Sequence, residues 1–356
     1  MGDIPSRSAT TPAGEPGVTG SHARSAGTGV SPNAPAGPPL GGGGALPTKK
    51  RFGMEAGFRG LSTAAGAMVL VIIVAIGFFL VSKAVPALQA NTENFLTYKA
   101  WFPNDAEPNF GIAALAFGTV LSSVIALIVA VPIALGIALF LSHYAPKRLA
   151  TPLGFVIDLL AAVPSVVFGL WGRDVFLNPV RDLSLWLNEY FSWIPIFGGD
   201  GPFGRSILLG SLVLAIMVLP IVTSLSREVF MQTPGMNEEA ALALGATKWE
   251  MIRTAVVPYG KPGIIAAIML GLGRALGETI ALALTLGIVF NISFNLIENG
   301  GNSIAANIAN TFGEANATGR GALIASGLVL FAITLVVNMA ARAIIYRRRE
   351  FRDSAA

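Results

Sequence analysis

The sequence contains no cysteine and only two histidines in its 356 residues. Without thiols, disulfide bonds, zinc fingers and cysteine catalysis are excluded. The two histidines, His22 and His143, are too few and too far apart for a metal site, so we expect none. Charged residues make up only 12% of the chain and hydrophobic residues 53%, whereas soluble domains carry roughly a quarter of charged residues. The composition therefore predicts an integral membrane protein in a lipid bilayer.

The net charge of +4 does not indicate a nucleic-acid partner. The basic residues form no amphipathic or glycine- and aromatic-rich pattern of the kind that binds RNA. They lie instead beside the ends of apolar stretches. We therefore expect no nucleic acid and interpret these charges as signals of membrane orientation.

The first part of the chain lacks apolar stretches. Of residues 1–48, 36 are Gly, Pro, Ala, Ser or Thr, a composition that cannot offset the entropy of ordering. We predict a disordered tail and a basic membrane-proximal segment over residues 1–60, followed by a transmembrane domain over residues 61–350. No basic region leads directly into an apolar one, so the tail does not read as a signal peptide.

Six apolar stretches are long enough to cross a hydrocarbon core of about 30 Å. They are Thr63–Val81, Ile112–Leu141, Pro152–Trp171, Ser206–Leu225, Pro262–Phe290 and Gly321–Tyr346. The predicted fold class is all-α, a polytopic membrane protein with six transmembrane helices and both termini on one side. Pro164 predicts a kink within the third stretch.

Lysine and arginine are distributed unequally between the two sets of loops. The set that includes both chain ends and residues 226–261 carries 15 of them near the spans, and the opposite set carries 6. Because cytoplasmic loops are enriched in these residues, we predict that both termini and the 226–261 segment are cytoplasmic.

The 226–261 segment has the signals of a helical hairpin. Pro234 opens a helix, Glu238 and Glu239 favour its N-terminal end, and Gly245 can close it in a left-handed conformation. Thr247–Glu250 reads as a capping box that starts a second helix. The hairpin can dock into another protein or pack on its own membrane domain, and these features alone favour neither.

No phosphate-binding P-loop is present. The sequence Gly260-Lys261 is followed by Pro262, and Ala255 stands where the first glycine would be required. The chain therefore offers no predicted site for ATP with its Mg²⁺, and we expect neither cofactor nor catalytic residue in it.

Two ionisable residues lie inside the fifth apolar stretch. Arg274 is about 18 Å along the expected helix, too deep to reach either surface easily, and Glu278 follows one turn later, where it can pair with Arg274. Gly273 and Gly277 leave the same region without side chains. A guanidinium on such a face suits an oxyanion, because it offers a planar fork of donors. A purely structural Arg–Glu pair is the alternative.

Two further polar residues have simpler interpretations. Asp158 lies in the third stretch, and we predict that it pairs with Lys147 or Arg148 at the cytoplasmic edge. His143 is expected to be an interfacial side chain.

The hairpin resembles the EAA loop of ABC importer permeases, EAA-x3-G-x9-I-x-L-P. The matching residues are Glu239, Ala240, Ala241, Gly245 and Pro258. Ala255 and Val257 replace the usual isoleucine and leucine, and both remain apolar. The resemblance implies that residues 239–245 form a coupling helix that docks into an ATP-binding subunit.

Two other stretches resemble the phosphate-specific Pst permeases, in the PstC-type form. They are Gly271–Thr279 (GLGRALGET) and Ala161–Gly172 (AAVPSVVFGLWG), supported by Phe110–Ile112 and by Gly118-Thr119. The resemblance covers about residues 61–346. It implies a type I ABC importer permease fold in a bacterial cell membrane.

The same resemblance implies a phosphate path and a set of partners. The path residues would be Arg274, Glu278, Gly273, Gly277 and Thr279. Partners would be a PstA-like permease subunit, two ATP-binding subunits and an extracytoplasmic phosphate-binding protein. A permease for another oxyanion, such as sulfate or molybdate, and an ion-coupled secondary transporter remain as alternatives.

Overall fold

The structure is a computed structural model that describes residues 52–353, with the side chains of residues 57–343. The predicted tail lies outside the described residues up to Arg51. The chain divides into two compact units, Met1–Ser62 and Thr63–Ala356. All of the candidate functional residues belong to the second unit.

Five helices are long and apolar enough to cross a membrane. They lie within α1 (Phe52–Ala90), α2 (Ala113–Leu139), α6 (Ile207–Met231), α9 (Val257–Leu276, preceded by α8) and α12 (Ala317–Asp353). These helices overlap five of the six predicted spans and confirm the helical fold class.

The third predicted span is not one straight helix. Helix α3 (Lys147–Ala161) ends before Pro164, and α4 (Ser165–Trp171) then continues through a π-helical turn, η2 (Gly172–Phe176), into α5 (Leu177–Phe191). The two halves meet at 89°, and the count reaches six spans if this bent pair is one. Pro164 has no N–H and its ring clashes with the preceding turn, so the predicted kink is confirmed while the single span Pro152–Trp171 is wrong.

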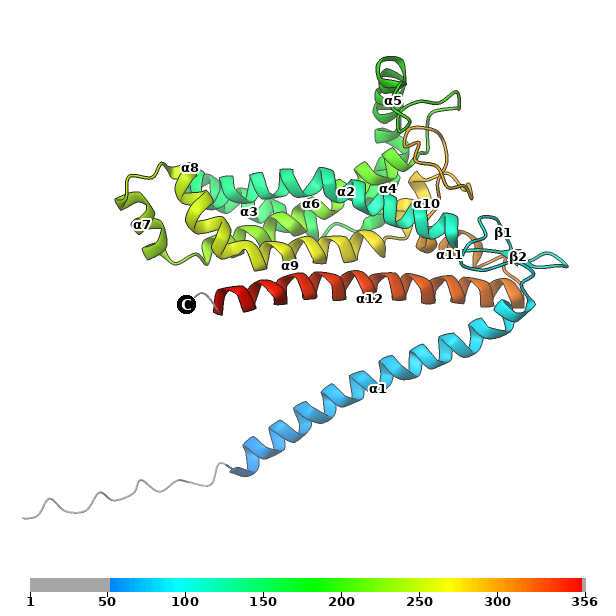
Figure 1. Ribbon diagram of the computed structural model, residues 1–356, viewed down its shortest axis with the longest axis horizontal. Coiled ribbons are helices and arrows are strands. Elements are labelled where there is room, and N and C mark those ends of the chain that lie inside the picture. Colours follow the sequence, from blue (N-terminus) through cyan, green and yellow to red (C-terminus); the bar gives the residue numbers. More distant parts are fainter. Residues whose placement is uncertain (1–51, 354–356) are drawn as a thin grey trace, which may run out of the picture. The chain divides into compact units, whose positions relative to one another are not determined.

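Helix α6 is the central element of the second unit. Of its most apolar window, 67% is buried, whereas the corresponding values for the other four candidate spans are 28% or less. It packs against α2, α3 and α9 (Figure 1). On α2, four fully buried alanines recur every fourth residue: Ala126, Ala130, Ala134 and Ala138. Small side chains at this spacing form one helix face and let two backbones approach closely.

A short β-hairpin follows α1. Strands β1 (Trp101–Phe102) and β2 (Asn109–Phe110) pair antiparallel. The side chain of Asn91 donates to the Phe110 carbonyl at 2.8 Å and accepts from the Phe110 N–H at 3.0 Å. The rings of Trp101 and Phe110 meet edge to face, 5.6 Å between centroids. These strands are too short for a periodic signal, so the sequence did not predict them.

A second loop docks on the start of α2. Helix α11 (Ile304–Thr311) begins after Ser303, whose hydroxyl accepts from the Ala306 N–H at 3.1 Å. The Ile304 N–H donates to the Thr119 hydroxyl of α2 at 2.9 Å. One residue earlier, a Cβ on Gly118 would overlap the backbone carbonyl oxygen of Asn302. The loop therefore lies directly against the α2 backbone.

This contact predicts a large effect of a small change. Replacing Gly118 by Ala forces backbone apart at the α2–α11 junction, which we expect to destabilise the fold by about 1–3 kcal/mol. The matched control is Gly136→Ala in the same helix, where an added Cβ meets nothing within 4 Å. The temperature midpoint of thermal aggregation of the detergent-solubilised protein should fall for G118A alone. Equal midpoints for the two variants would contradict the prediction.

Candidate functional site

The hairpin between α6 and α9 forms as the sequence predicts. Helix α7 (Gly235–Ala243) begins after Pro234. Gly245 has φ 85°, and its N–H donates to the Leu242 carbonyl at 2.9 Å. The predicted left-handed helix end at Gly245 is therefore confirmed.

The second half of the hairpin also follows its prediction. Helix α8 (Lys248–Met251) starts with a capping box in which the Glu250 N–H donates to the Thr247 hydroxyl at 3.3 Å and the Thr247 N–H donates to the Glu250 carboxylate at 2.8 Å. A π-helical turn, η3 (Ile252–Val256), leads into α9, with Pro258 in the first turn. Because the caps satisfy the free N–H groups at the start of α8, the hairpin is well ordered locally.

No residue of α7 is buried. Glu239, Ala240 and Gly245 are exposed and Ala241 is half-buried. Large apolar side chains beside them are also exposed: Met236 at 80%, Leu244 at 90% and Trp249 at 59%. Packing on the chain's own membrane domain therefore does not explain this surface, and apolar side chains so exposed are typical of a docking surface for another protein.

The hairpin contacts the end of α2 through two polar contacts. Helix α2 runs into a π-helical turn, η1 (Phe140–Tyr144). His143 Nε2 lies 3.5 Å from Glu238 Oε1, and the Lys248 ammonium lies 4.8 Å from the centroid of the Tyr144 ring. The prediction of a merely interfacial His143 missed this contact, because Glu238 is distant in sequence.

Helix α9 ends earlier than predicted. It stops at Leu276 and does not run on to Phe290, and after the turn the short helix α10 (Ile280–Thr285) begins. Arg274 is therefore close to the end of its helix and not in the middle. The glycine at position 277 has low helix propensity, and the Thr279 hydroxyl donates to the Gly277 carbonyl at 3.2 Å.

The structural pair of Arg274 with Glu278, one of the two interpretations left open by the sequence, is not found in the described residues. Among the described side chains, no ion pair joins them; Glu278 is buried, and its Oε1 accepts from the Ala281 N–H at 3.2 Å. The i, i+4 relation requires a continuous helix, and the break at Gly277 turns Glu278 towards α10. Glu278 thus caps α10.

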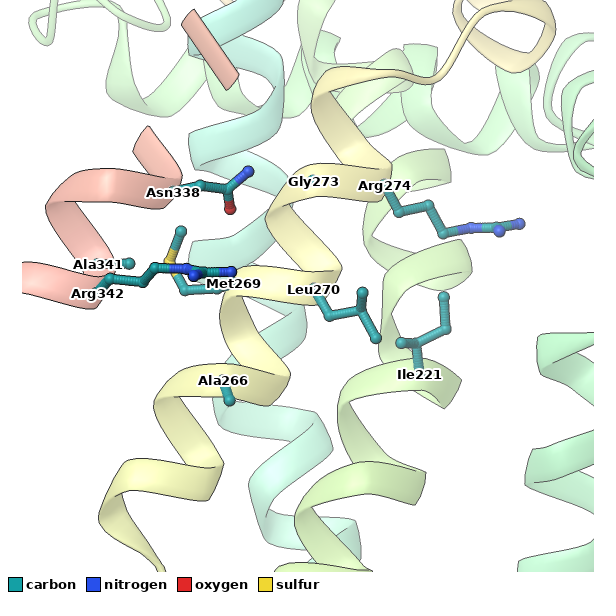
Figure 2. Close-up of a pocket in the computed structure, with 9 residues that line it drawn as sticks. All are labelled: Ile221, Ala266, Met269, Leu270, Gly273, Arg274, Asn338, Ala341 and Arg342. Atoms are coloured by element: carbon teal, nitrogen blue, oxygen red, sulfur yellow. The ribbon is translucent and has the colours of Figure 1, made fainter. Parts of the chain in front are cut away.

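Arg274 lines a cavity of about 700 Å³. Figure 2 shows the lining side chains, which come from α6, α9 and α12: Ile221, Ala266, Met269, Leu270, Gly273, Arg274, Asn338, Ala341 and Arg342. The Arg274 Nε is buried and finds no hydrogen-bond partner among the described residues. Of the predicted path residues, Arg274 and Gly273 line this cavity, whereas Gly277, Glu278 and Thr279 form the turn into α10.

Asp158 has a different partner from the predicted one. The Ser224 hydroxyl of α6 donates to Asp158 Oδ1 at 2.7 Å, across the α3–α6 contact. Among the described residues, neither Lys147 nor Arg148 forms an ion pair with it. Asp158 is eleven residues from Lys147, about 16 Å along α3, which is too far for that pair.

Arg205 was predicted only as a loop charge, yet it supports α10. Its Nη2 donates to the Ala283 carbonyl at 2.9 Å, and its Nε is buried without a hydrogen-bond partner. Burial, and then the positive charge of Arg173, lower the pKa of Arg205. The sequence did not indicate this contact, because the two partners are 78 residues apart.

Comparisons with known proteins identify the family of the chain. Residues 130–350 match the family described as binding-protein-dependent transport system inner membrane component. The chain is 46% identical over 292 residues to "Phosphate transport system permease protein PstC 2" of Mycobacterium tuberculosis, covering 81% of this chain and 90% of that protein. A PstC of Xylella fastidiosa is 40% identical over 294 residues, covering 82% and 90%.

Among solved structures, the chain is similar to one from the inward-facing MetNI methionine ABC transporter. The TM-score is 0.46 at 14% identity, covering 65% of this chain and 93% of that chain. The family match over most of the transmembrane region and the two relatives agree with each other. The chain belongs to the family of binding-protein-dependent transport system inner membrane components, among the PstC permeases.

Proposed function

We propose that this chain is the permease subunit of an ATP-driven importer of inorganic phosphate. The observation that carries the proposal is the 46% identity, over 81% of the chain, to a protein named as a phosphate transport system permease. The cavity beside Arg274 supports it, because an unpaired guanidinium within the membrane domain suits a translocated anion.

Arg274 would bind the anion transiently in this function. Its guanidinium forms no ion pair among the described residues, so a passing phosphate would neutralise its charge. Gly273 has open space around its Cα, since an added Cβ would meet nothing within 4 Å. Glu278 would act indirectly: it fixes the start of α10 and leaves the Arg274 charge uncompensated. Passage requires weak binding, so a single unpaired donor group is sufficient.

ATP and Mg²⁺ would be bound by partner subunits. The exposed hairpin surface, defined by Met236, Glu239, Ala240, Leu244 and Trp249, would dock into an ATP-binding subunit. Its contacts with η1 connect the docked hairpin to α2, and the continuous chain from α8 through η3 connects it to α9. Movement of the partner would thereby reach the two helices that pack on α6.

The remaining partners and the orientation follow from the same function. A PstA-like subunit would pair with this chain, two ATP-binding subunits would dock from the cytoplasm, and an extracytoplasmic binding protein would deliver phosphate. The excess of 15 over 6 basic residues near the spans supports cytoplasmic termini and a cytoplasmic hairpin. The location would be a bacterial cell membrane.

Labelled phosphate uptake into vesicles tests this function. The vesicles would hold the chain with its cognate permease and ATP-binding subunits, and the binding protein would be supplied outside. We expect uptake that requires ATP on the cytoplasmic side and that excess sulfate or molybdate does not suppress. Suppression by those anions would indicate another oxyanion importer, and uptake without ATP would indicate a secondary transporter.

Arg274 provides the first prediction from this function. Replacing it by Gln should lower phosphate uptake by about tenfold or more, because a charged hydrogen bond is worth about 1.5–3 kcal/mol. Arg274→Lys should retain part of the activity, since it keeps the charge but loses the planar fork. Arg320→Gln, an exposed arginine distant in sequence, serves as the control. Wild-type uptake by an assembled R274Q complex would remove Arg274 from the path.

Gly245 provides the second prediction. Leu at this position should abolish phosphate-stimulated ATP hydrolysis, because φ 85° costs an L-residue about 1–2 kcal/mol and the side chain would occupy the docking surface. Gly245→Asn, which tolerates the left-handed conformation, should be milder. Gly313→Leu is the matched control, since an added Cβ there meets nothing within 4 Å. Full co-purification and stimulation of the ATPase with G245L would argue against docking at the hairpin.

A further inference from the structure

A second arginine lines the cavity beside Arg274. Arg342 lies on α12, 68 residues further along the chain, and the sequence places it among the basic residues at the end of the last apolar stretch. From its position alone, Arg342 is a topology signal that can extend towards lipid headgroups. The structure brings it together with Arg274 and Asn338 around one space of about 700 Å³.

The two arginines approach the exposed face of α9 from different sides. Helix α12 packs alongside α9, and Figure 2 shows Arg342 pointing from α12 towards Met269, while Arg274 leaves α9 on the side of α6. Arg274 is five residues beyond Met269, about 7.5 Å along the helix axis. Ala266 and Gly273, which also line the space, add little side-chain volume to it.

The polar groups of this cavity are almost all hydrogen-bond donors. None of its nine lining residues carries a carboxylate, and neither arginine takes part in an ion pair within residues 57–343. Two unpaired cations that share a cavity in a region of low dielectric repel one another. An anion in this cavity would offset their charges and could accept hydrogen bonds from a guanidinium.

Asn338 contributes the only side-chain oxygen among the nine lining residues. Its carboxamide can donate to an anion and can also accept a hydrogen bond. A phosphate that retains one proton has an O–H to donate, whereas sulfate at neutral pH has none. A site that hydrogen-bonds such a group discriminates against an analogue that lacks it.

We propose that Arg342 and Asn338 form a second anion site of the transport path, next to Arg274. Arg342 holds the anion and Asn338 favours a singly protonated tetrahedral oxyanion over a fully ionised one. The identity of the anion as inorganic phosphate rests on the proposed function. The site itself rests on the cavity, on its lining residues and on the charges of Arg274 and Arg342.

Uptake by the complete complex tests Arg342. At a phosphate concentration below KM, R342Q should lower ATP-dependent uptake by about tenfold, the size expected for loss of a charged hydrogen bond. R342K should raise KM for phosphate by about threefold or more with a smaller change in maximal rate, because lysine keeps the charge and loses the bidentate geometry. The control R148Q removes an equally exposed basic charge at the start of α3 and should behave as wild type.

These outcomes separate the inference from the function on which it rests. Wild-type complex without ATP-dependent phosphate uptake would overturn the proposed function and leave the cavity to be tested as below. The role of Arg342 would be overturned if the wild-type complex imports phosphate and both R342Q and R342K stay within about twofold of its KM and maximal rate. A change of about twofold is well below the effect of losing one charged hydrogen bond.

The absence of cysteine permits a second test that does not depend on transport. In the assembled complex, Asn338→Cys should react faster with an anionic methanethiosulfonate reagent than with a cationic one, and inorganic phosphate should slow the reaction. Adding R342Q should lower the anionic-to-cationic rate ratio by about fivefold, because a nearby positive charge concentrates anions. Val336→Cys, on an exposed part of α12 outside the cavity, should show no preference for the anionic reagent and no slowing by phosphate.

The labelling result decides the proposal even if R342Q fails to assemble in transport assays. Asn338→Cys alone reports whether the cavity is wet and positive. No reaction at this position, or equal rates with the two reagents, would overturn the proposal whichever anion the complex imports.

Discussion

Close packing between α2 and α6 is the constraint on which the rest of this structure depends. In a bilayer, helices gain little from hiding apolar side chains, so association relies on van der Waals contact and on near approach of backbones. The alanine face of α2 provides that approach. Helix α6 is the most buried of the candidate spans, and α3, α9 and α10 also contact it. Other surfaces, including one face of α9, stay exposed in the isolated chain.

The functional residues lie where helices are interrupted. Proline or glycine interrupts the helices at Pro164, Gly245 and Gly277. The breaks at Pro164 and Gly277 free backbone groups that need partners inside the membrane domain. At the last break, Glu278 accepts from the Ala281 N–H and Arg205 donates to the Ala283 carbonyl. Glu278 is thereby engaged with backbone, and Arg274 keeps an uncompensated charge facing the cavity.

Helix α9 joins the two candidate functional regions. Its 20 residues span about 30 Å, the thickness of the hydrocarbon core. The hairpin precedes its first turn and Arg274 lies in its last turn. In the proposed function, a rigid helix of this length transmits a movement of the hairpin to the position of the anion. The contacts of His143 and Tyr144 with the hairpin give α2 a share in the same movement.

The sequence by itself determined the features that depend on local chemistry. Apolar length identified the membrane helices, Pro164 identified the kink, and the residues from Pro234 to Glu250 specified both halves of the hairpin, because caps and left-handed turns are formed by near neighbours. Only the tertiary structure decided the long-range partners. Glu278 caps α10, Asp158 pairs with Ser224, and Arg342 joins Arg274 in one cavity. The physical reason is that these partnerships depend on where a helix stops and on which helix lies beside it. Residue spacing along the chain indicates neither of these.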